Sequence, residues 1–354
     1  MRPLDRLLVL DLTRLLPGAV ATETLAAFGA RVIKIEQPGL GDYARRGFAD
    51  PAAENPLFAA TNRGKESVEL DLKTALGKEA LRKIASQADV LIEGFRPGVM
   101  DRLDLGFDQL RAANPGLIWV ALSGYGQTGE HSQRAGHDIN YMAMAGVLDQ
   151  IGTAATPMIP GVQLADLAGG SMQVVTGVLL ALAARARSGE GQFVDVSMTH
   201  GVSSLLTVPL SAYWASGALP ERGNDWLTGR YACYGVYRAA EGFVAVGALE
   251  PKFWGTLCNE LGLAEFAARQ FDENQQDVKA ALAARFAQKT AEEWFTLLGD
   301  KDCCLTPVRD LATAVIASEP QPALRGTPGE YSARVPALGE HTHAVLREFD
   351  AGNC

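Results

Sequence analysis

The chain has 354 residues, of which 47% are hydrophobic and 21% charged, a balance that allows a large buried core, argues against disorder and suits two domains. Its formal net charge of −9 opposes nucleic-acid binding as a general activity, because a polyphosphate backbone attracts basic surfaces. A small anionic ligand would instead need a local basic cluster. The N-terminal part supplies candidates, although scattered surface charge explains them more simply: Arg14, Arg45, Arg46, Arg63, Lys65, Lys73 and Arg96.

Short apolar runs alternate with helical patterns through the N-terminal half, beginning with a βαβ unit. In this unit we expect a strand at 6–12, a turn at Pro17-Gly18, a helix at 20–28 and a second strand at 31–36. Further strands are expected at 67–72, 89–92, 117–122 and 192–197, and helices at 75–87 and from Asp166 to Arg185 or Arg187. The alternation predicts an α/β fold with a doubly wound, mostly parallel sheet.

The pattern changes at about Gly223. Residues 234–238 and 242–247 predict an antiparallel hairpin, and helical stretches fill residues 252–298. We therefore divide the chain into a large α/β domain (1–190), a linker (191–222), a smaller α+β domain (223–309) and a tail (310–354) that returns to the large domain.

The cysteines are odd in number and show no Cys-x-x-Cys spacing: Cys233, Cys258, Cys303, Cys304 and Cys354. They favour neither a disulfide framework nor a cysteine-based zinc site, which fits a cytoplasmic location. The N-terminal residues do not resemble a secretory signal. The longest apolar stretch, Met172 to Ala184, is shorter than the roughly 20 residues that cross a bilayer, so we expect a buried helix and no membrane partner.

The first βαβ unit invites comparison with dinucleotide-binding folds, since Glu36 ends the second strand where such folds keep a ribose-binding acid. The connecting loop offers Gly18 where Gly-x-Gly-x-x-Gly is required, so NAD binding is disfavoured. Ser123 lacks the Gly-x-Ser-x-Gly setting of a hydrolase nucleophile, and the chain has no P-loop motif.

The most informative feature is the run Gly136-His137-Asp138-Ile139-Asn140-Tyr141, with Asp166 lying 29 residues after the histidine. An imidazole and a carboxylate, each beside glycines that let a substrate approach, can move a proton on and off carbon. Both residues also have structural interpretations, the histidine as a hydrogen-bonded residue and Asp166 as an N-cap. The N-terminus of that helix, left open by Gly169-Gly170, could in turn stabilise an oxyanion such as an enolate.

Nearly the whole chain resembles the family III coenzyme A transferases. The blocks that carry this resemblance are Asp11-Leu-Thr-Arg, Phe28-Gly-Ala-Arg-Val-Ile-Lys-Ile-Glu, Asn62-Arg-Gly-Lys, Leu70-Asp-Leu-Lys73, Asp89 to Gly98, Leu122-Ser-Gly-Tyr-Gly-Gln-Thr-Gly, Asp166-Leu-Ala-Gly-Gly, Gly189 to Met198, Val246 to Pro251 and Cys304 to Val308. The Gly-His-Asp-Ile-Asn-Tyr block is similar to the racemase branch, which acts on α-methylacyl-CoA.

The resemblance implies an interlocked homodimer in which the large domain of one subunit faces the small domain of the other. It implies an acyl-CoA substrate, with coenzyme A as part of the substrate and no further cofactor or metal. The implied coenzyme A contacts are Gln37, Leu70, Leu72, Lys73, Gly94, Phe95, Arg96, Gly136, Asp138 and Tyr141. Gln37 stands where many members have an arginine.

In the racemase interpretation, His137 and Asp166 flank the α-carbon of a 2-methylacyl thioester, and Glu250 of the small domain orients His137. One residue removes the α-proton to form an enolate, and the other returns a proton to the opposite face. In the transferase alternative, Asp166 is a nucleophile that moves coenzyme A between carboxylic acids. A third hypothesis is a catalytically silent acyl-CoA binding protein.

Some positions depart from the racemase pattern. The asparagine usual four residues before the catalytic aspartate is replaced by Val162, with Gln163 beside it, which leaves the partner of Asp166 open. Arg14 and Gly41-Asp42 look more like transferase members. Leu16, and the absence of a Gly-Gly-Gly-Gly loop, disfavour formyl-CoA transferase itself.

Overall fold

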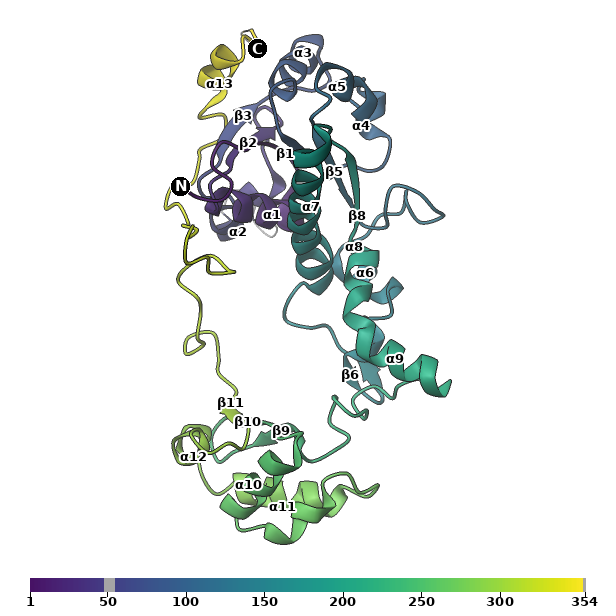
Figure 1. Ribbon diagram of the computed structural model, residues 1–354, viewed down its shortest axis with the longest axis vertical. Helices are drawn as coiled ribbons and strands as arrows, with labels where there is room; N and C mark the ends of the chain where they lie inside the picture. Colours follow the sequence, from purple (N-terminus) through teal and green to yellow (C-terminus); the bar gives the residue numbers. More distant parts are fainter. Residues whose placement is uncertain (48–54, 353–354) are drawn as a thin grey trace. The chain divides into compact units, whose positions relative to one another are not determined.

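The computed structural model describes residues 1–47 and 55–352, and the chain falls into two compact units (Figure 1). The first comprises Met1–Val147, Pro160–Thr207 and Ala317–Cys354, and the second comprises Leu148–Ile159 and Val208–Ile316. Residues 48–54 of the predicted large domain, and Asn353 and Cys354 of the predicted tail, lie outside the described residues. The predicted boundary at residue 190 differs from the structure, because the strand at 193–197 belongs to the sheet of the first unit.

Within the described residues, the first unit is built on a six-stranded parallel sheet of order β3-β2-β1-β4-β5-β8. Its strands are β1 (Leu8–Leu12), β2 (Arg31–Glu36), β3 (Glu66–Glu69), β4 (Val90–Glu93), β5 (Ile118–Ser123) and β8 (Phe193–Ser197). Its helices are α1 (Leu15–Ala27), α2 (Pro56–Thr61), α3 (Ala75–Ala85), α4 (Val99–Arg102), α5 (Phe107–Ala113), α6 (Asp138–Met144), α7 (Met172–Ser188), α8 (Met198–Ser203) and α13 (Thr342–Glu348). The predicted doubly wound parallel sheet is confirmed.

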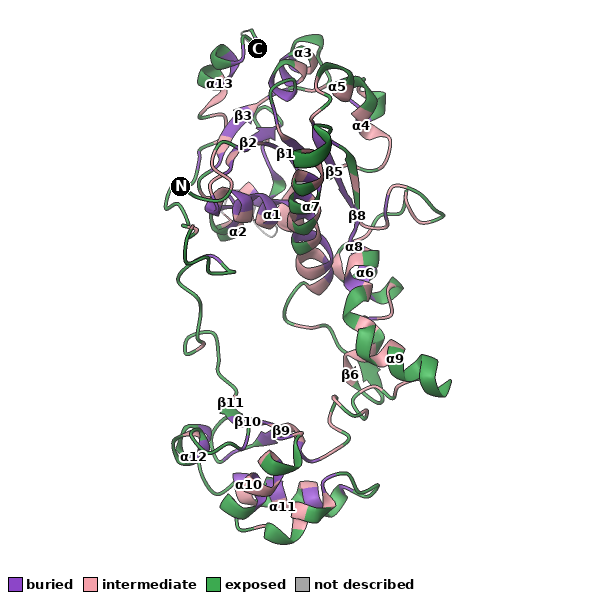
Figure 2. Ribbon diagram, in the orientation of Figure 1, coloured by how far each residue is buried: buried purple, intermediate pink, exposed green. Residues whose placement is uncertain are grey.

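Helices cover both faces of this sheet, and the strands are accordingly buried (Figure 2). Leu10, Ile33 and Leu91 share one face and pack in a cluster with residues of α3, α5 and α13. Because side chains alternate along a strand, their neighbours in sequence point to the other face, which α1 and α7 cover. Parallel strands buried on both faces explain why the sequence reads as continuous apolar runs.

Helix α1 begins five residues earlier than predicted, at Leu15, so the turn expected at Pro17-Gly18 is wrong. Proline is tolerated in the first turn of a helix, where its missing N–H would have no intrahelical partner. Gly18 is required for packing instead, because a Cβ there would lie 2.2 Å from Oγ1 of Thr13.

A π-helical turn, Ala165–Ser171, precedes α7 and continues into it. Together, Ala165–Ser188 are long and apolar enough to cross a membrane by length and composition, yet a third of that window is buried in the structure. Here the helix packs on α1, β5 and β8. The expectation of a buried helix holds for one flank, which includes Val178, whereas Met172 and Leu180 are 63% and 67% exposed.

The second unit has a small antiparallel sheet of order β11-β10-β9. Its elements are β6 (Gly152–Thr153), β7 (Thr156–Pro157), α9 (Thr207–Ser216), β9 (Tyr234–Arg238), β10 (Phe243–Gly247), α10 (Pro251–Glu260), α11 (Gln276–Phe286), α12 (Ala291–Leu298) and β11 (Leu305–Pro307). The predicted hairpin is confirmed as β9 and β10, paired in register from Phe243 with Arg238 to Gly247 with Tyr234. The core of this unit contains Trp254 and Phe286, both fully buried.

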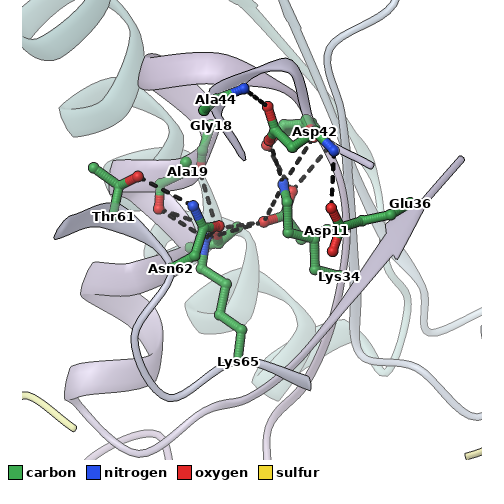
Figure 3. Close-up of polar contacts among 12 residues, drawn as sticks. Asp11, Gly18, Ala19, Lys34, Glu36, Asp42, Ala44, Thr61, Asn62 and Lys65 are labelled. Atoms are coloured by element: carbon green, nitrogen blue, oxygen red, sulfur yellow. Dashed lines mark hydrogen bonds and ion pairs between the residues drawn. The ribbon is translucent and has the colours of Figure 1, made fainter. Parts of the chain in front are cut away.

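Charged side chains lie inside the first unit, between the sheet and α1 (Figure 3). Asp11 of β1 is the register partner of Lys34 of β2, and all atoms of both side chains are buried. The ammonium group of Lys34 lies 3.7 Å from Oδ2 of Asp11 and 2.9 Å from Oδ2 of Asp42. The ammonium group of Lys65 lies 3.2 Å from the same oxygen of Asp11 and donates to Oδ1 of Asn62 at 2.8 Å.

The electrostatics of this network favour the ionised carboxylate of Asp11. Burial acts to raise the pKa of Asp11, but Lys34 and Lys65 outweigh it and hold that pKa well below its ordinary value. At Lys65 burial outweighs the attraction of Asp11 and lowers the pKa to about 8, so the ammonium form is weakened but still predominates at pH 7. The ionised carboxylate of Asp11 therefore stabilises the fold at neutral pH, and that contribution is lost only as pH falls below the ordinary carboxyl range.

Replacing Asp11 with asparagine should lower the free energy of unfolding by about 3–5 kcal/mol, because two buried ammonium groups would lose their shared counter-charge. Urea denaturation at pH 7 measures this. The control is Asp104→Asn, since Asp104 is 75% exposed in its ion pair with Lys78, and that loss should stay under about 1 kcal/mol. Similar losses in the two variants would contradict a structural role for the network.

Candidate active site

Most of the residues expected to contact coenzyme A follow the carboxyl ends of strands of the parallel sheet. Gln37 follows β2, Leu70–Lys73 follow β3 and Gly94–Arg96 follow β4. In a parallel sheet these ends share one edge, and ligands bind where the strand order reverses, here between β1 and β4. The structure thus brings these segments to the edge of the sheet that suits a ligand.

These residues differ in what they can offer a ligand. Gln37, Lys73, Gly94 and Arg96 are exposed, and Leu72 and Phe95 are half-buried. Leu70 is 2% exposed and belongs to the hydrophobic core, so it can present backbone atoms to a ligand but not its side chain. Contact of this set with coenzyme A stays a prediction.

Three of the seven basic residues suggested by the sequence pair with protein carboxylates. Arg45 forms two hydrogen bonds with Glu36, at 2.6 and 2.7 Å, and Arg63 donates to Glu23 at 2.7 Å. Lys65 is buried against Asp11. These three residues therefore support the fold, in agreement with the simpler interpretation that they are not a site for an anionic ligand. The pairing also accounts for Glu36, which is an ion-pair partner and not an open ribose-binding acid.

Helix α6, which the sequence analysis did not predict, begins directly after His137. The imidazole is exposed, and the backbone N–H of His137 donates to Oδ1 of Asn140 at 3.1 Å. Tyr141 donates its hydroxyl proton to the carbonyl of Gly136. A Cβ at Gly136 would lie 2.8 Å from the Tyr141 ring, and one at Gly124 2.3 Å from it. These glycines make room for the Tyr141 ring, and an approach of substrate to Gly136 stays a prediction.

Asp138 connects the histidine segment to the aspartate segment. Its Oδ1 accepts hydrogen bonds from the backbone N–H of Ala165 at 2.7 Å and of Asp166 at 3.0 Å. The residue next to His137 is thereby hydrogen-bonded to the backbone of Asp166, which brings the two segments together. A shared catalytic role of His137 and Asp166 stays a prediction. The same bonds occupy the N–H groups of Ala165 and Asp166 at the start of the π-helical turn, so these two are not free to bind an enolate oxygen. Stabilisation of an enolate by the other N–H groups of this turn stays a prediction.

Asp166 is half-buried within the π-helical turn, and it does not cap a helix as the structural interpretation proposed. Burial, and then the nearby carboxylate of Asp138, raise the pKa of Asp166 to about 7. Burial also raises the pKa of Tyr141 to about 12, with Asp166 and Tyr125 adding to the rise and Arg96 opposing it. The electrostatic influence of Asp166 and Arg96 on Tyr141 indicates that these residues share a local environment.

Gly169 and Gly170 serve packing and not substrate access, which corrects the expectation from the sequence. A Cβ at Gly169 would lie 2.5 Å from the carbonyl oxygen of Met198 in α8, and one at Gly170 would lie 3.2 Å from Cβ of Pro17. The hydroxyl of Ser171 donates to the carbonyl of Pro17 at 2.6 Å and of Asp166 at 3.2 Å. The start of α1 is therefore coupled to the backbone of Asp166.

Glu250, and Val162 with Gln163, are the other residues that the sequence analysis connected with the reaction. Glu250 is exposed in the second unit, directly before α10, and its proposed role with His137 stays a prediction. Val162, which replaces the usual asparagine, is 55% exposed. The carbonyl of Gln163 accepts from the N–H of Leu167 at 3.0 Å.

Sequence reasoning missed a buried carboxyl at the end of β4. Burial raises the pKa of Glu93 to about 8, so at neutral pH this side chain is mostly protonated. Its Oε2 accepts from the N–H of Phe95 at 2.7 Å, which shapes the loop that carries Phe95 and Arg96. A charged residue just before Gly94 was the available signal, but burial of its side chain depends on the packing of the whole sheet.

Comparisons with known proteins agree with this architecture. The profile of CoA-transferase family III matches residues 4–322. An α-methylacyl-CoA racemase from Homo sapiens is 37% identical over 365 residues, covering 96% of this chain and 92% of that protein. An acetyl-CoA:oxalate CoA-transferase from Acetobacter aceti is 35% identical over 333 residues, covering 91% and 84%. A CaiB/BaiF family protein from Brucella suis has a similar crystal structure, with a TM-score of 0.85, 29% identity, and coverage of 99% and 100%.

Asp166→Asn should stabilise the protein increasingly as pH rises from 5 to 8. The raised pKa means that the folded wild type loses stability between the ordinary carboxyl value of 3.8 and about 7, as a buried carboxylate ionises. Asparagine removes that cost, whose upper limit is about 4 kcal/mol, since one pKa unit corresponds to about 1.4 kcal/mol. Urea denaturation at both pH values measures the difference. The control is Asp108→Asn, which changes an exposed aspartate. The raised pKa would be contradicted if Asp166→Asn increased the free energy of unfolding equally at pH 5 and pH 8, or by no more than the control does.

Proposed function

The chain belongs to CoA-transferase family III, and on that basis we propose that it is an enzyme that epimerises 2-methylacyl-CoA thioesters at the α-carbon. One observation carries the proposal: Asp138 bonds the backbone of Asp166 and so joins the segment of His137 to a carboxyl whose pKa is about 7. A general acid or base works best when its pKa lies near the working pH. The similarity to α-methylacyl-CoA racemases supports the same reaction.

The reaction needs two proton-carrying groups on opposite sides of the α-carbon. In one direction the ionised carboxylate of Asp166 takes the α-proton, and the C–H electron pair moves into an enolate. The protonated imidazole of His137 then gives its proton to the other face, which inverts the centre. In the reverse direction the roles exchange, and Asp166 gives the proton. A carboxyl that is about half ionised near neutral pH can serve both directions.

We propose further that coenzyme A lies along the carboxyl edge of the sheet, against Leu70–Lys73, Gly94–Arg96 and Gly136–Tyr141, and that a second copy of the chain supplies Glu250. Exposed apolar side chains support an association of copies. Leu180 of α7 is 67% exposed and Trp214 of α9 is 76% exposed. Groups of exposed apolar side chains, such as Met172, Leu179 and Leu180 along α7, are candidate surfaces for a partner to cover, whereas single ones are not.

The second candidate function is transfer of coenzyme A between carboxylic acids, which the similarity to acetyl-CoA:oxalate CoA-transferase supports. The carboxylate of Asp166 would attack the thioester carbonyl, and the C–S bond would break to release the coenzyme A thiolate and leave a mixed anhydride. The thiolate would then attack the aspartyl carbonyl, freeing the first acid and forming an aspartyl thioester for the acceptor acid. His137 has no role in this reaction.

Incubation of the wild type with 2-methylbutyryl-CoA in D₂O should place deuterium on the α-carbon, as mass spectrometry of the ester measures. His137→Gln and Asp166→Asn should each slow interconversion of the two epimers by about 10² to 10⁴, the usual contribution of an acid-base group. The matched control is His343→Gln, an exposed histidine of α13, which should behave as the wild type. Failure of the wild type to exchange with any branched acyl-CoA would exclude epimerisation and leave transfer or silent binding.

The transferase alternative predicts a covalent adduct. Hydroxylamine added during turnover with an acyl-CoA and an acceptor acid should convert Asp166 to its hydroxamate, which peptide mass spectrometry detects. Epimerisation predicts an unmodified Asp166 under the same conditions. If a His137→Gln variant keeps full transferase activity and still forms the adduct on Asp166, transfer of coenzyme A is established in place of epimerisation.

A further inference from the structure

Arg14 lies where the strand order reverses. It follows β1 by two residues, as Phe95 follows β4, and β1 and β4 are neighbouring parallel strands. A Cβ built on Gly94 would lie 3.7 Å from Cβ of Thr13, so the two loops touch at this point. The crevice at such a reversal is the usual ligand position of an open α/β sheet.

Aromatic rings hold the guanidinium of Arg14. Its Cζ lies 5.0 Å from the centre of the Tyr43 ring and 5.5 Å from that of Phe95, and its Nη1 donates to the hydroxyl of Tyr43 at 3.0 Å. These contacts restrict the side chain, and among the described residues only the hydroxyl of Tyr43 accepts a hydrogen bond from the guanidinium. Within residues 1–47 and 55–352, no carboxylate forms an ion pair with Arg14, in contrast to Arg45 and Arg63.

The backbone beside Arg14 is fixed from inside the protein. Leu15 has φ of +62°, a strained value for a leucine, and its N–H donates to Oδ1 of Asp42 at 2.9 Å. The same oxygen accepts from the N–H of Ala44 at 2.9 Å, and the other oxygen of Asp42 pairs with buried Lys34 at 2.9 Å. Asp42 thus fixes the residue after Arg14 and the residue after Tyr43 together.

The position of Arg14 is also coupled to the proposed reaction centre. Arg14 is the N-cap residue of α1, and Pro17 in the first turn of that helix accepts the hydroxyl of Ser171, which bonds the backbone of Asp166 as well. Phe95, one of the two rings against Arg14, is adjacent to Arg96, whose charge acts on Tyr141.

We propose that Arg14 is a substrate-binding residue whose guanidinium receives an oxyanion of the bound acyl-CoA, either a carboxylate at the end of the acyl chain or a phosphate of coenzyme A. The guanidinium of Arg14 is planar, is positioned by the rings of Tyr43 and Phe95, and has no carboxylate partner among the described residues. Such a group can form two parallel hydrogen bonds with a carboxylate or a phosphate. The inference rests on the proposed acyl-CoA site. In the carboxylate case it narrows the substrate class to thioesters of dicarboxylic acids.

Binding of three ligands to the full-length protein, measured by calorimetry, tests the proposal. Succinyl-CoA and butyryl-CoA have four-carbon acyl chains that differ in a terminal carboxylate, and S-butyrylpantetheine has no phosphate or carboxylate. In Arg14→Gln, loss of affinity for succinyl-CoA by about tenfold or more, without loss for butyryl-CoA, identifies the carboxylate. Equal loss for both CoA esters, without loss for S-butyrylpantetheine, identifies a phosphate.

Unchanged affinity for all three ligands, or an equal loss that includes S-butyrylpantetheine, would overturn the proposal. Arg14→Lys, which keeps the charge but not the fork, guards against a folding defect and should give a smaller loss of the same pattern. The control Arg111→Gln removes an exposed arginine that pairs with Glu190 at 3.1 Å, and it should bind as the wild type does. The binding experiment measures no turnover, so its outcome is independent of the proposed reaction. If binding depends on Arg14 but the wild type shows no α-deuterium exchange, epimerisation is refuted and the role of Arg14 is retained.

Discussion

The site depends on two hydrogen bonds from the backbone N–H groups of Ala165 and Asp166 to one carboxylate oxygen of Asp138. Bonds of an N–H to a charged oxygen are among the stronger polar contacts of a protein, and these two join segments 27 and 28 residues apart. They place the residue after His137 on the backbone of Asp166. They also bring a negative charge close to the Asp166 carboxyl, which adds to the effect of burial in raising its pKa to about 7.

Asp42 likewise binds backbone N–H groups of two loops, at another place on the edge of the sheet where the strands end. Oδ1 of Asp42 accepts from the N–H groups of Leu15 and Ala44, and so fixes the residues that follow Arg14 and Tyr43. The charge of Asp42 is in turn balanced by Lys34, deep between the sheet and α1. Buried charge in this fold therefore has a positional effect, because it orders loops that regular secondary structure does not reach.

The features that could be predicted from the sequence are those that depend on residues close together in the chain. Apolar runs and turn residues were sufficient for the parallel sheet and for the hairpin of β9 and β10, and the Gly-His-Asp block identified the histidine segment. Local patterns failed where a distant contact decided the structure. Gly169 and Gly170 are small because α8 and α1 pack against them. Asp166 does not cap its helix because it lies within the π-helical turn, and Asp138 accepts from the first N–H groups of that turn instead. The occupation of Arg45 and Lys65 by carboxylates likewise depends on the folded sheet.

In the proposed epimerisation, His137 and Asp166 act from opposite faces of one α-carbon. The most direct test follows α-proton exchange in D₂O separately from each pure epimer of a 2-methylacyl-CoA, in His137→Ala and in Asp166→Ala. We expect each variant to retain exchange with the epimer whose proton faces the remaining base, so the two variants should act on opposite epimers. Exchange of the same epimer by both variants would contradict the claim.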